Sequence, residues 1–301
     1  MFWIYRLNLV AILLLPVALV WSVLLKISRA ISRLFCKKSS KTPVISFSQI
    51  TTFRIGKTPL MRVVAKYLGA PVIVMDEDYW NTKMLTDAGI SVLQNGVATA
   101  IETAEFMGKK YPAVIVDGNP RNADIKILVF DDFFGIGNGL PSPAGPMIDS
   151  LRSGIKNSDA VLIIQGDDKT VPASLLRITK QYGRPLFLAR REMAVTGLFG
   201  KFVAFTAIPY PTRFFESLRA VPAIRLVDRI KFQPGKFLDK KTTVELFYKA
   251  RRFDARLITT EKDWHGLPRN IRAKVKKASI QITLPPNFYI WLEKKLGDRN
   301  V

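Results

Sequence analysis

The tripeptide Gly56-Lys57-Thr58 is the part of the sequence whose residue types and spacing most directly indicate chemistry. It lies between an apolar run at 43–47 and a segment that opens with Pro59. In a phosphate-binding loop, backbone N–H groups hold phosphate oxygens, the lysine neutralises the terminal phosphates and the threonine hydroxyl reaches Mg²⁺. We therefore predict a nucleotide site at Gly56, Lys57 and Thr58. An ordinary strand-to-helix turn with a solvated lysine is the alternative.

The residues before this tripeptide depart from the usual loop. A phosphate-binding loop has glycine at the position of Thr51 and small residues where this chain has Phe53 and Arg54. Glycine serves there because the backbone takes a positive φ or approaches the ligand closely. We expect the two bulky side chains to distort or fill the phosphate cradle and so to weaken nucleotide binding.

Three aspartates follow two further apolar runs. Asp117 ends one run, and Asp131 and Asp132 end the next. Carboxylate oxygens suit Mg²⁺, and a carboxylate can accept a proton during phosphoryl transfer. We predict these three as catalytic residues, with Asp117 and Thr58 as metal ligands. For Asp131 and Asp132 the alternative is an acid that caps the next turn.

The composition limits the other kinds of site. Lys and Arg number 46 against 24 Asp and Glu, a formal charge of +22, which predicts an anionic partner: a membrane, a phosphorylated substrate or nucleic acid. Cys36 and His265 are the single cysteine and the single histidine, so an internal disulfide framework is excluded and a Cys/His zinc site nearly so. His265 is a poor candidate for a general base, with a surface or packed histidine as the alternative.

Short apolar runs separated by helix-length segments must position these residues. Strands that are apolar throughout, with helices between them, indicate a parallel sheet covered on both faces, a doubly wound α/β fold whose ligands bind at the carboxyl ends of the strands. We predict an α/β core at 42–192 and a smaller α/β lobe at 193–301. The predicted strands are 43–47, 71–75, 113–117, 126–131, 160–164 and 185–188, then 202–205, 224–227, 256–259 and 280–283. The predicted helices are 58–68, 97–110 and 170–182, then 211–220, 240–253 and 286–296.

The N-terminus predicts a membrane anchor at 1–41. The nineteen residues from Leu7 to Leu25 carry no charge, and about 20 apolar residues suffice for a helix to cross a bilayer. A basic flank without acids follows, which indicates a cytoplasmic body resting on anionic headgroups. Because Pro16 lies in mid-segment, a helix that dips into one leaflet is an alternative, and a buried core helix is another.

Six segments in order resemble the tetraacyldisaccharide 4′-kinase family, the lipid A kinases of the inner membrane. The most specific of them are Gly135–Pro146, called the glycine-rich loop below, and the Thr-Thr-Glu-Lys-Asp segment at Thr259–Asp263. The matching segments are Pro43–Ser46, Gly56–Pro59, Asp117-Gly118, Gly135–Pro146, Arg213–Phe215 and Thr259–Asp263.

This resemblance implies a P-loop-type α/β fold and transfer of the ATP γ-phosphoryl group, with Mg²⁺, to the 4′-hydroxyl of a tetraacyldisaccharide 1-phosphate. It places the protein at the inner membrane with its catalytic body on the cytoplasmic side, and it makes the lipid A disaccharide precursor a partner. Asn138 and Lys262, which lie in the two most specific motifs, are the implied phosphate or substrate contacts.

Several family features are absent. The family's Asp-Asp-Gly is Val116-Asp117-Gly118 here, and its Asp-His pair is missing from the corresponding stretch 232–237. A catalytically weakened pseudokinase of the same fold, which binds the lipid A precursor or nucleotide, is therefore the alternative function. A nucleic-acid-binding membrane protein is a third reading, but the basic residues are scattered without an aromatic-interleaved patch, so we expect no nucleic-acid partner.

Overall fold

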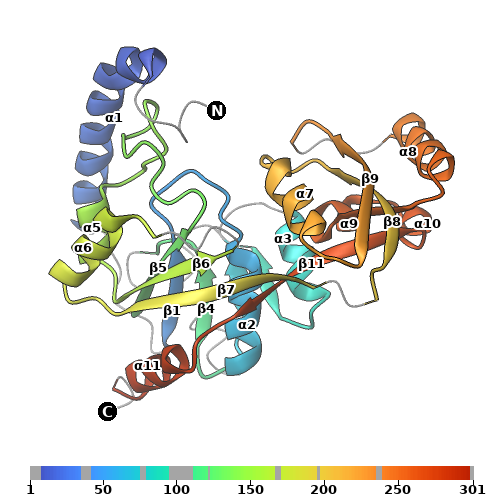
Figure 1. The fold of residues 1–301 in the computed structure, drawn as a ribbon. Coiled ribbons are helices and arrows are strands. Elements are labelled where there is room, and N and C mark those ends of the chain that lie inside the picture. The colour runs from blue at the N-terminus through green and yellow to red at the C-terminus, as the bar shows by residue number, and fades with distance from the viewer. Residues whose placement is uncertain are drawn as a thin grey trace. The chain divides into compact units, whose positions relative to one another are not determined.

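A computed structural model supplies the architecture (Figure 1). It describes residues 8–34, 42–74, 79–94, 111–120, 123–166, 171–194, 197–234 and 239–298. The predicted helix at 97–110 and the basic residues at 35–41 lie outside the described residues. The chain divides into two compact units, the first comprising 1–78, 88–191 and 282–301 and the second comprising 79–87 and 192–281.

The first unit contains a parallel sheet in the order β3-β2-β4-β1-β5-β6-β7. This confirms the predicted α/β class with a large, mostly parallel sheet. The apolar runs are buried because helices or loops cover them; one face of β5 and β6 packs against Leu151, Ile155, Leu175 and Ile178. The strands are β1 (Val44–Ser48), β2 (Val72–Val74), β3 (Val92–Gln94), β4 (Val114–Asp117), β5 (Ile125–Asp131), β6 (Ala160–Gln165) and β7 (Leu186–Ala194). The helices are α2 (Lys57–Leu68), α5 (Leu151–Lys156), α6 (Ala173–Gln181) and α11 (Pro286–Gly297).

The second unit has its own parallel strands in the order β11-β10-β8-β9. Successive residues of β8 face opposite ways: Phe202 packs with α7, and Phe205 packs with α8. The strands are β8 (Gly200–Thr206), β9 (Ile224–Lys231), β10 (Arg256–Thr260) and β11 (Val275–Thr283). The helices are α3 (Tyr79–Thr86), α7 (Pro211–Arg219), α8 (Lys240–Arg252), α9 (Glu261–Gly266) and α10 (Arg269–Arg272).

Two segments group differently from the division drawn from the sequence. The C-terminal helix α11 belongs to the first unit, where Phe288 packs edge-on against Phe187 of β7 with ring centroids 5.2 Å apart. Residues 79–87, which the sequence analysis assigns to the core, belong to the second unit, where α3 packs on α9. Both assignments depend on contacts between residues far apart in sequence, which hydrophobic periodicity does not report.

The N-terminal segment forms one long helix, α1 (Leu9–Leu34), with Pro16 inside it. Asn8 begins the helix, since its side-chain oxygen accepts a hydrogen bond from the N–H of Ala11 at 2.8 Å. Ala11 and Ala18 are buried, while large apolar side chains such as Leu13 and Val20 are exposed. Within the ranges that the structure describes, no helix combines the length and the apolar character needed to cross a membrane.

Candidate active site

The loop between β1 and α2 ends at Gly56, which has the left-handed conformation (φ 76°, ψ 41°). Glycine adopts this conformation without strain, and a Cβ here would have no other atom within 4 Å, so backbone conformation is the reason for glycine at this position. Gly56 is also the N-cap of α2 and supplies no side chain to cap it. The first-turn N–H groups of a helix have no partners within the helix, so this N-terminus is suited to an anion.

Lys57 and Asp117 form an ion pair at the carboxyl end of the sheet. The Lys57 Nζ lies 2.6 Å from Asp117 Oδ1, each side chain is 15% exposed, and the ammonium also donates to the carbonyl of Phe47 at 3.3 Å. The register explains the contact, because β1 and β4 are neighbours and Phe47 lies opposite Asp117. The structure thus brings together the predicted lysine and the predicted metal ligand. Thr58, the next residue, is buried.

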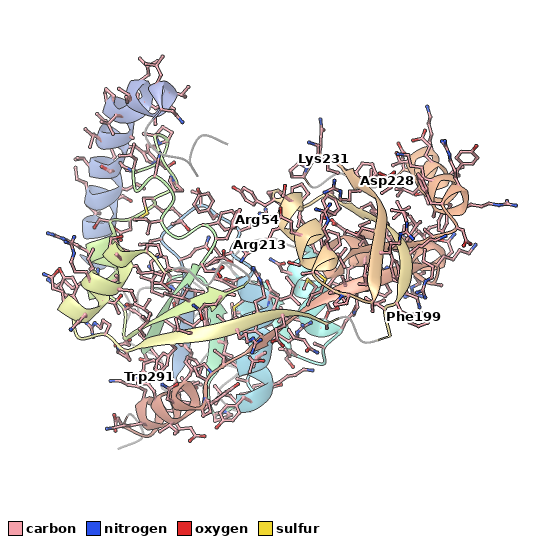
Figure 2. All side chains as sticks on the ribbon, in the orientation of Figure 1. Arg54, Phe199, Arg213, Asp228, Lys231 and Trp291 are labelled. Carbon is pink, nitrogen blue, oxygen red and sulfur yellow. The ribbon has the colours of Figure 1, made fainter. Side chains whose placement is uncertain are left out.

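Phe53 does not project into solvent from the phosphate loop. It is 2% exposed, and its ring stacks on Phe134 with centroids 4.7 Å apart and an interplanar angle of 18°. The side-chain amide of Gln49 donates to the carbonyls of Thr51 and Phe53 at 2.9 and 3.0 Å. Arg54, labelled in Figure 2, has an exposed side chain. The two bulky residues therefore have different environments, one packed inside and one at the surface.

Backbone hydrogen bonds join the phosphate loop to the end of the glycine-rich loop. Thr52 N–H donates to the carbonyl of Pro146 at 2.9 Å, and Ile148 N–H donates to the carbonyl of Ile50 at 2.8 Å. An antiparallel bridge pairs Thr51 with Met147 between them. The two loops, about ninety residues apart in the chain, therefore form one backbone-paired structure.

The glycine-rich loop closes on itself through Asn138. The amide of Asn138 donates to the carbonyl of Ala144 at 3.0 Å, and its oxygen accepts the N–H of Leu140 at 3.1 Å. A Cβ on Gly145 would lie 2.2 Å from the Asn138 oxygen and 2.4 Å from the carbonyl of Leu140, so only glycine fits there. Both polar atoms of the Asn138 side chain thus organise the loop, and its predicted contact with phosphate or substrate stays a prediction.

Asp131 and Asp132 are both buried and hydrogen-bonded within the first unit. Asp131, 1% exposed, pairs with Arg191 at 3.1 Å and accepts the N–H groups of Phe133 and Phe134 at 3.0 and 3.4 Å. Asp132 accepts the N–H of Gly166 at 2.6 Å. The contacts of Asp131 match the turn-capping alternative, whereas Asp132 accepts from a backbone N–H that lies 34 residues away. The predicted catalytic role of both residues stays a prediction. Arg191 lies 60 residues from Asp131, and no sequence pattern connects the two.

The Thr-Thr-Glu-Lys-Asp motif lies at the end of β10 in the second unit. Asp263 Oδ2 accepts the hydroxyl of Thr206, the N–H of Ala207 at 3.1 Å and the hydroxyl of Thr260 at 2.8 Å. Thr260 is the N-cap of α9 and accepts the N–H of Asp263. Lys262 is half-buried on the same helix, and its predicted role as a substrate contact stays a prediction.

His265 is packed inside the second unit, which matches the predicted alternative of a packed histidine. It is 2% exposed, and its Nδ1 lies 3.1 Å from Asp87 Oδ2. Burial lowers the pKa of His265, and the nearby Asp87 carboxylate opposes that shift. The imidazole of α9 therefore lies against the residue that follows α3, and its Nδ1 has no hydrogen-bond partner among the residues that the structure describes.

Among the described residues, no group of three or more His, Cys, Asp or Glu side chains converges as metal ligands. Mg²⁺ is commonly held by one or two protein oxygens together with substrate phosphates and water. The Thr58 hydroxyl and the Asp117 carboxylate, which adjoin Lys57, fit that mode of binding.

A parallel sheet, a glycine-ended loop leading into a helix, and a lysine paired with an aspartate from the neighbouring strand of the sheet define the class of P-loop-type nucleotide-binding α/β proteins. Comparison with known proteins makes the assignment specific. The sequence model of the family described as tetraacyldisaccharide-1-P 4′-kinase matches residues 120–297, more than half of the chain, and the chain belongs to that family.

Individual relatives agree with this assignment. The tetraacyldisaccharide 4′-kinase of Maricaulis maris is 34% identical over 171 residues, covering 54% of this chain and 48% of the relative. The enzyme of the same name from Paramagnetospirillum magneticum is 27% identical over 270 residues, covering 80% of this chain and 81% of the relative. A crystal structure of LpxK from Aquifex aeolicus in complex with ATP superposes with a TM-score of 0.67 over 97% of this chain and 99% of that one; at 14% identity, this likeness shows the fold.

Proposed function

We propose that this chain uses ATP to phosphorylate the 4′-hydroxyl of a tetraacyldisaccharide 1-phosphate in lipid A biosynthesis. Family membership supports the substrate class. The observation that carries the proposal is the pairing of Lys57 with Asp117 at the uncapped N-terminus of α2. Phosphoryl transfer depends on alignment and charge neutralisation more than on covalent chemistry, and a helix N-terminus with an adjacent lysine supplies both.

Each part of the nucleotide site has a specific role in this proposal. The N–H groups that follow Gly56 hold phosphate oxygens, which the left-handed glycine permits because no side chain covers the helix N-terminus. Lys57 exchanges its contact with Asp117 for the terminal phosphates. Asp117 and the Thr58 hydroxyl would hold Mg²⁺, which would supply neutralisation of the negative charge on the phosphates.

The pseudokinase alternative is favoured by the acids at the end of β5. Asp131 and Asp132 are engaged by Arg191 and by backbone N–H groups, so proton acceptance by either would compete with a structural hydrogen bond. In that alternative the chain binds nucleotide or the lipid A precursor without transferring phosphate.

We propose that α1 lies at the inner membrane, with the catalytic body on the cytoplasmic side. Exposed apolar side chains run along the helix, among them Leu9, Leu13, Val20 and Trp21, and the net charge of +22 suits an anionic surface. A form that lacks residues 1–41 should leave the membrane fraction at least in part. Unchanged retention of that form in high salt would contradict the role of this segment, because salt screens the remaining basic surface.

The deciding experiment is a phosphoryl-transfer assay with the full chain in mixed micelles. We expect phosphate from γ-labelled Mg·ATP to appear at the 4′ position of tetraacyldisaccharide 1-phosphate, and Lys57→Met to serve as the matched inactive control. Mg·ATP binding without transfer would support the pseudokinase alternative. A chain that binds neither Mg·ATP nor the lipid would overturn both functions.

A further inference from the structure

The predicted phosphate loop has two bulky residues where small ones are usual, and one of them, Phe53, is packed inside the protein. Phe53 occupies a position where a phosphate-binding loop usually has a small residue. A ring that filled the phosphate cradle would stand at the mouth of the loop. Instead the ring is 2% exposed and stacks on Phe134, the residue that precedes the glycine-rich loop.

The stack reinforces a backbone connection between the same two loops. Thr52, the residue before Phe53, donates its N–H to Pro146, and Thr51 pairs with Met147. Phe134 is itself held, because Asp131 accepts its N–H and Phe133 packs edge-on against its ring at 4.9 Å. Phe53 is therefore joined to a partner that is fixed to the end of β5.

We propose that Phe53 is a positioning residue for the nucleotide: its stack on Phe134 holds the phosphate loop in the conformation that presents Gly56 and Lys57. This inference rests on the proposed nucleotide-binding function. A glycine at position 53 gives the unliganded loop many conformations, which binding must then restrict. A buried aromatic ring removes that freedom before the nucleotide arrives, so the unliganded loop is already ordered.

This inference and the expectation from the sequence predict opposite changes in Mg·ATP affinity when Phe53 is replaced by glycine. If Phe53 obstructed the cradle, replacing it by glycine would raise the affinity for Mg·ATP. If Phe53 supports the loop, the same replacement lowers that affinity, because the stack and its preorganisation are lost together.

The test measures the Kd of Mg·ATP by calorimetry on the full chain, together with kcat and the KM of each substrate. We expect Phe53→Gly to raise the Kd and the KM for ATP about tenfold or more, with the KM for the lipid acceptor unchanged, since loop ordering and a stacked ring pair both contribute. Phe134→Leu should also raise the Kd of Mg·ATP. The double variant should lose less binding free energy for Mg·ATP than the two single variants lose in sum. Phe53→Tyr, which keeps the ring, should retain the Mg·ATP affinity of the unaltered chain.

A matched control is an aromatic residue outside these loops. Phe199, labelled in Figure 2, precedes β8 in the second unit and is exposed, so Phe199→Leu should leave all the constants unchanged. Should Phe53→Gly fail to fold, Phe53→Leu retains buried apolar volume and removes only the ring stack, and its KM for ATP should still rise.

The possible results distinguish a failure of the proposed role of Phe53 from a failure of the proposed function. Equal or tighter Mg·ATP binding by Phe53→Gly, in a chain that binds Mg·ATP when unaltered, overturns the role of Phe53 and leaves the proposed function standing. A parallel rise in the KM for ATP and the KM for lipid would also overturn it, since that result indicates general disruption. Failure of the unaltered chain to bind Mg·ATP would overturn the proposed function as well.

Discussion

Helices α2 and α9 each follow a parallel strand, α2 after a loop and α9 directly, but their first turns are built differently. At α2 the N-cap is Gly56, which offers no side chain, and the adjacent lysine pairs with Asp117 at the sheet edge. At α9 the N-cap is Thr260, whose hydroxyl accepts the N–H of Asp263. The carboxylate of Asp263 in turn accepts three hydrogen bonds from β8, the residue after it and the N-cap.

The contrast distinguishes a helix N-terminus that can bind a ligand from one that is satisfied by its own chain. Both motifs are among the segments that resemble the family, and Thr-Thr-Glu-Lys-Asp is the richer of the two in functional groups. Its Asp263 nevertheless stabilises the second unit, whereas the plainer Gly-Lys-Thr leaves backbone donors for an anion. A motif can therefore identify a family through residues that serve the fold.

The largest expected effect is at Lys57. Lys57→Met should lower kcat/KM for phosphoryl transfer by about 10²–10³-fold, the loss typical of removing one preorganised electrostatic contact from a reacting centre. It also removes the partner that lies 2.6 Å from Asp117. Lys57→Arg, which keeps the charge but not the shape, should recover part of the activity. Activity of Lys57→Met within a factor of two of the unaltered chain would contradict the assignment of this helix N-terminus.

A smaller effect, on stability rather than on catalysis, is expected at Asp263. Asp263→Asn should lower the free energy of unfolding by about 1–3 kcal/mol, because a charge-assisted acceptor of three hydrogen bonds becomes a weaker one. The measurement is urea unfolding. Asp254→Asn is the matched control: Asp254 is almost fully exposed, and asparagine tolerates its positive φ of 48°. Equal stability of the two variants would show that the Asp263 network does not hold the second unit together.

The smallest effect concerns the pH dependence of the stability of the second unit. Burial lowers the pKa of His265 below its unfolded value, so the unfolded chain binds the proton more readily. The stability contributed by neutral His265 is therefore complete above about pH 6.5 and is lost as the pH falls through the lower folded pKa. His265→Gln should lose less stability than the unaltered chain between pH 7.5 and pH 5.

A substitution at Asp87 should change the pH dependence of stability in the opposite direction from His265→Gln. The Asp87 carboxylate raises the pKa of His265, as Glu261 also does, whereas Lys277 and Arg272 lower it. Asp87→Asn should therefore depress the pKa of His265 further and steepen the loss of stability in acid. Thermal unfolding across this pH range measures both variants, and identical profiles for all three proteins would exclude His265 as a source of the pH dependence.

Much of the fold and part of the site could be predicted from the sequence. Apolar runs gave the strands because a buried parallel strand must be apolar on both faces. The chain order strand–Gly-Lys-Thr–helix then placed Lys57 at a carboxyl end, and the neighbouring strand brought Asp117 to it. Residues 79–87 and helix α11 group differently in the structure from the division drawn from the sequence, because each packs on a partner that periodicity cannot identify.

The fold class, the family and the Gly-Lys-Thr helix N-terminus could be predicted from the sequence, since these depend on residue order and local conformation. The roles of the surrounding side chains depend on contacts that form only in the folded chain. Asp131 meets Arg191 across 60 residues, Asp263 meets Thr206 across 57, and Phe53 meets Phe134 through neighbouring loops. A carboxylate or an aromatic ring has the same chemistry in any sequence; its role depends on which donors and which apolar surfaces the fold places within a few ångströms of it.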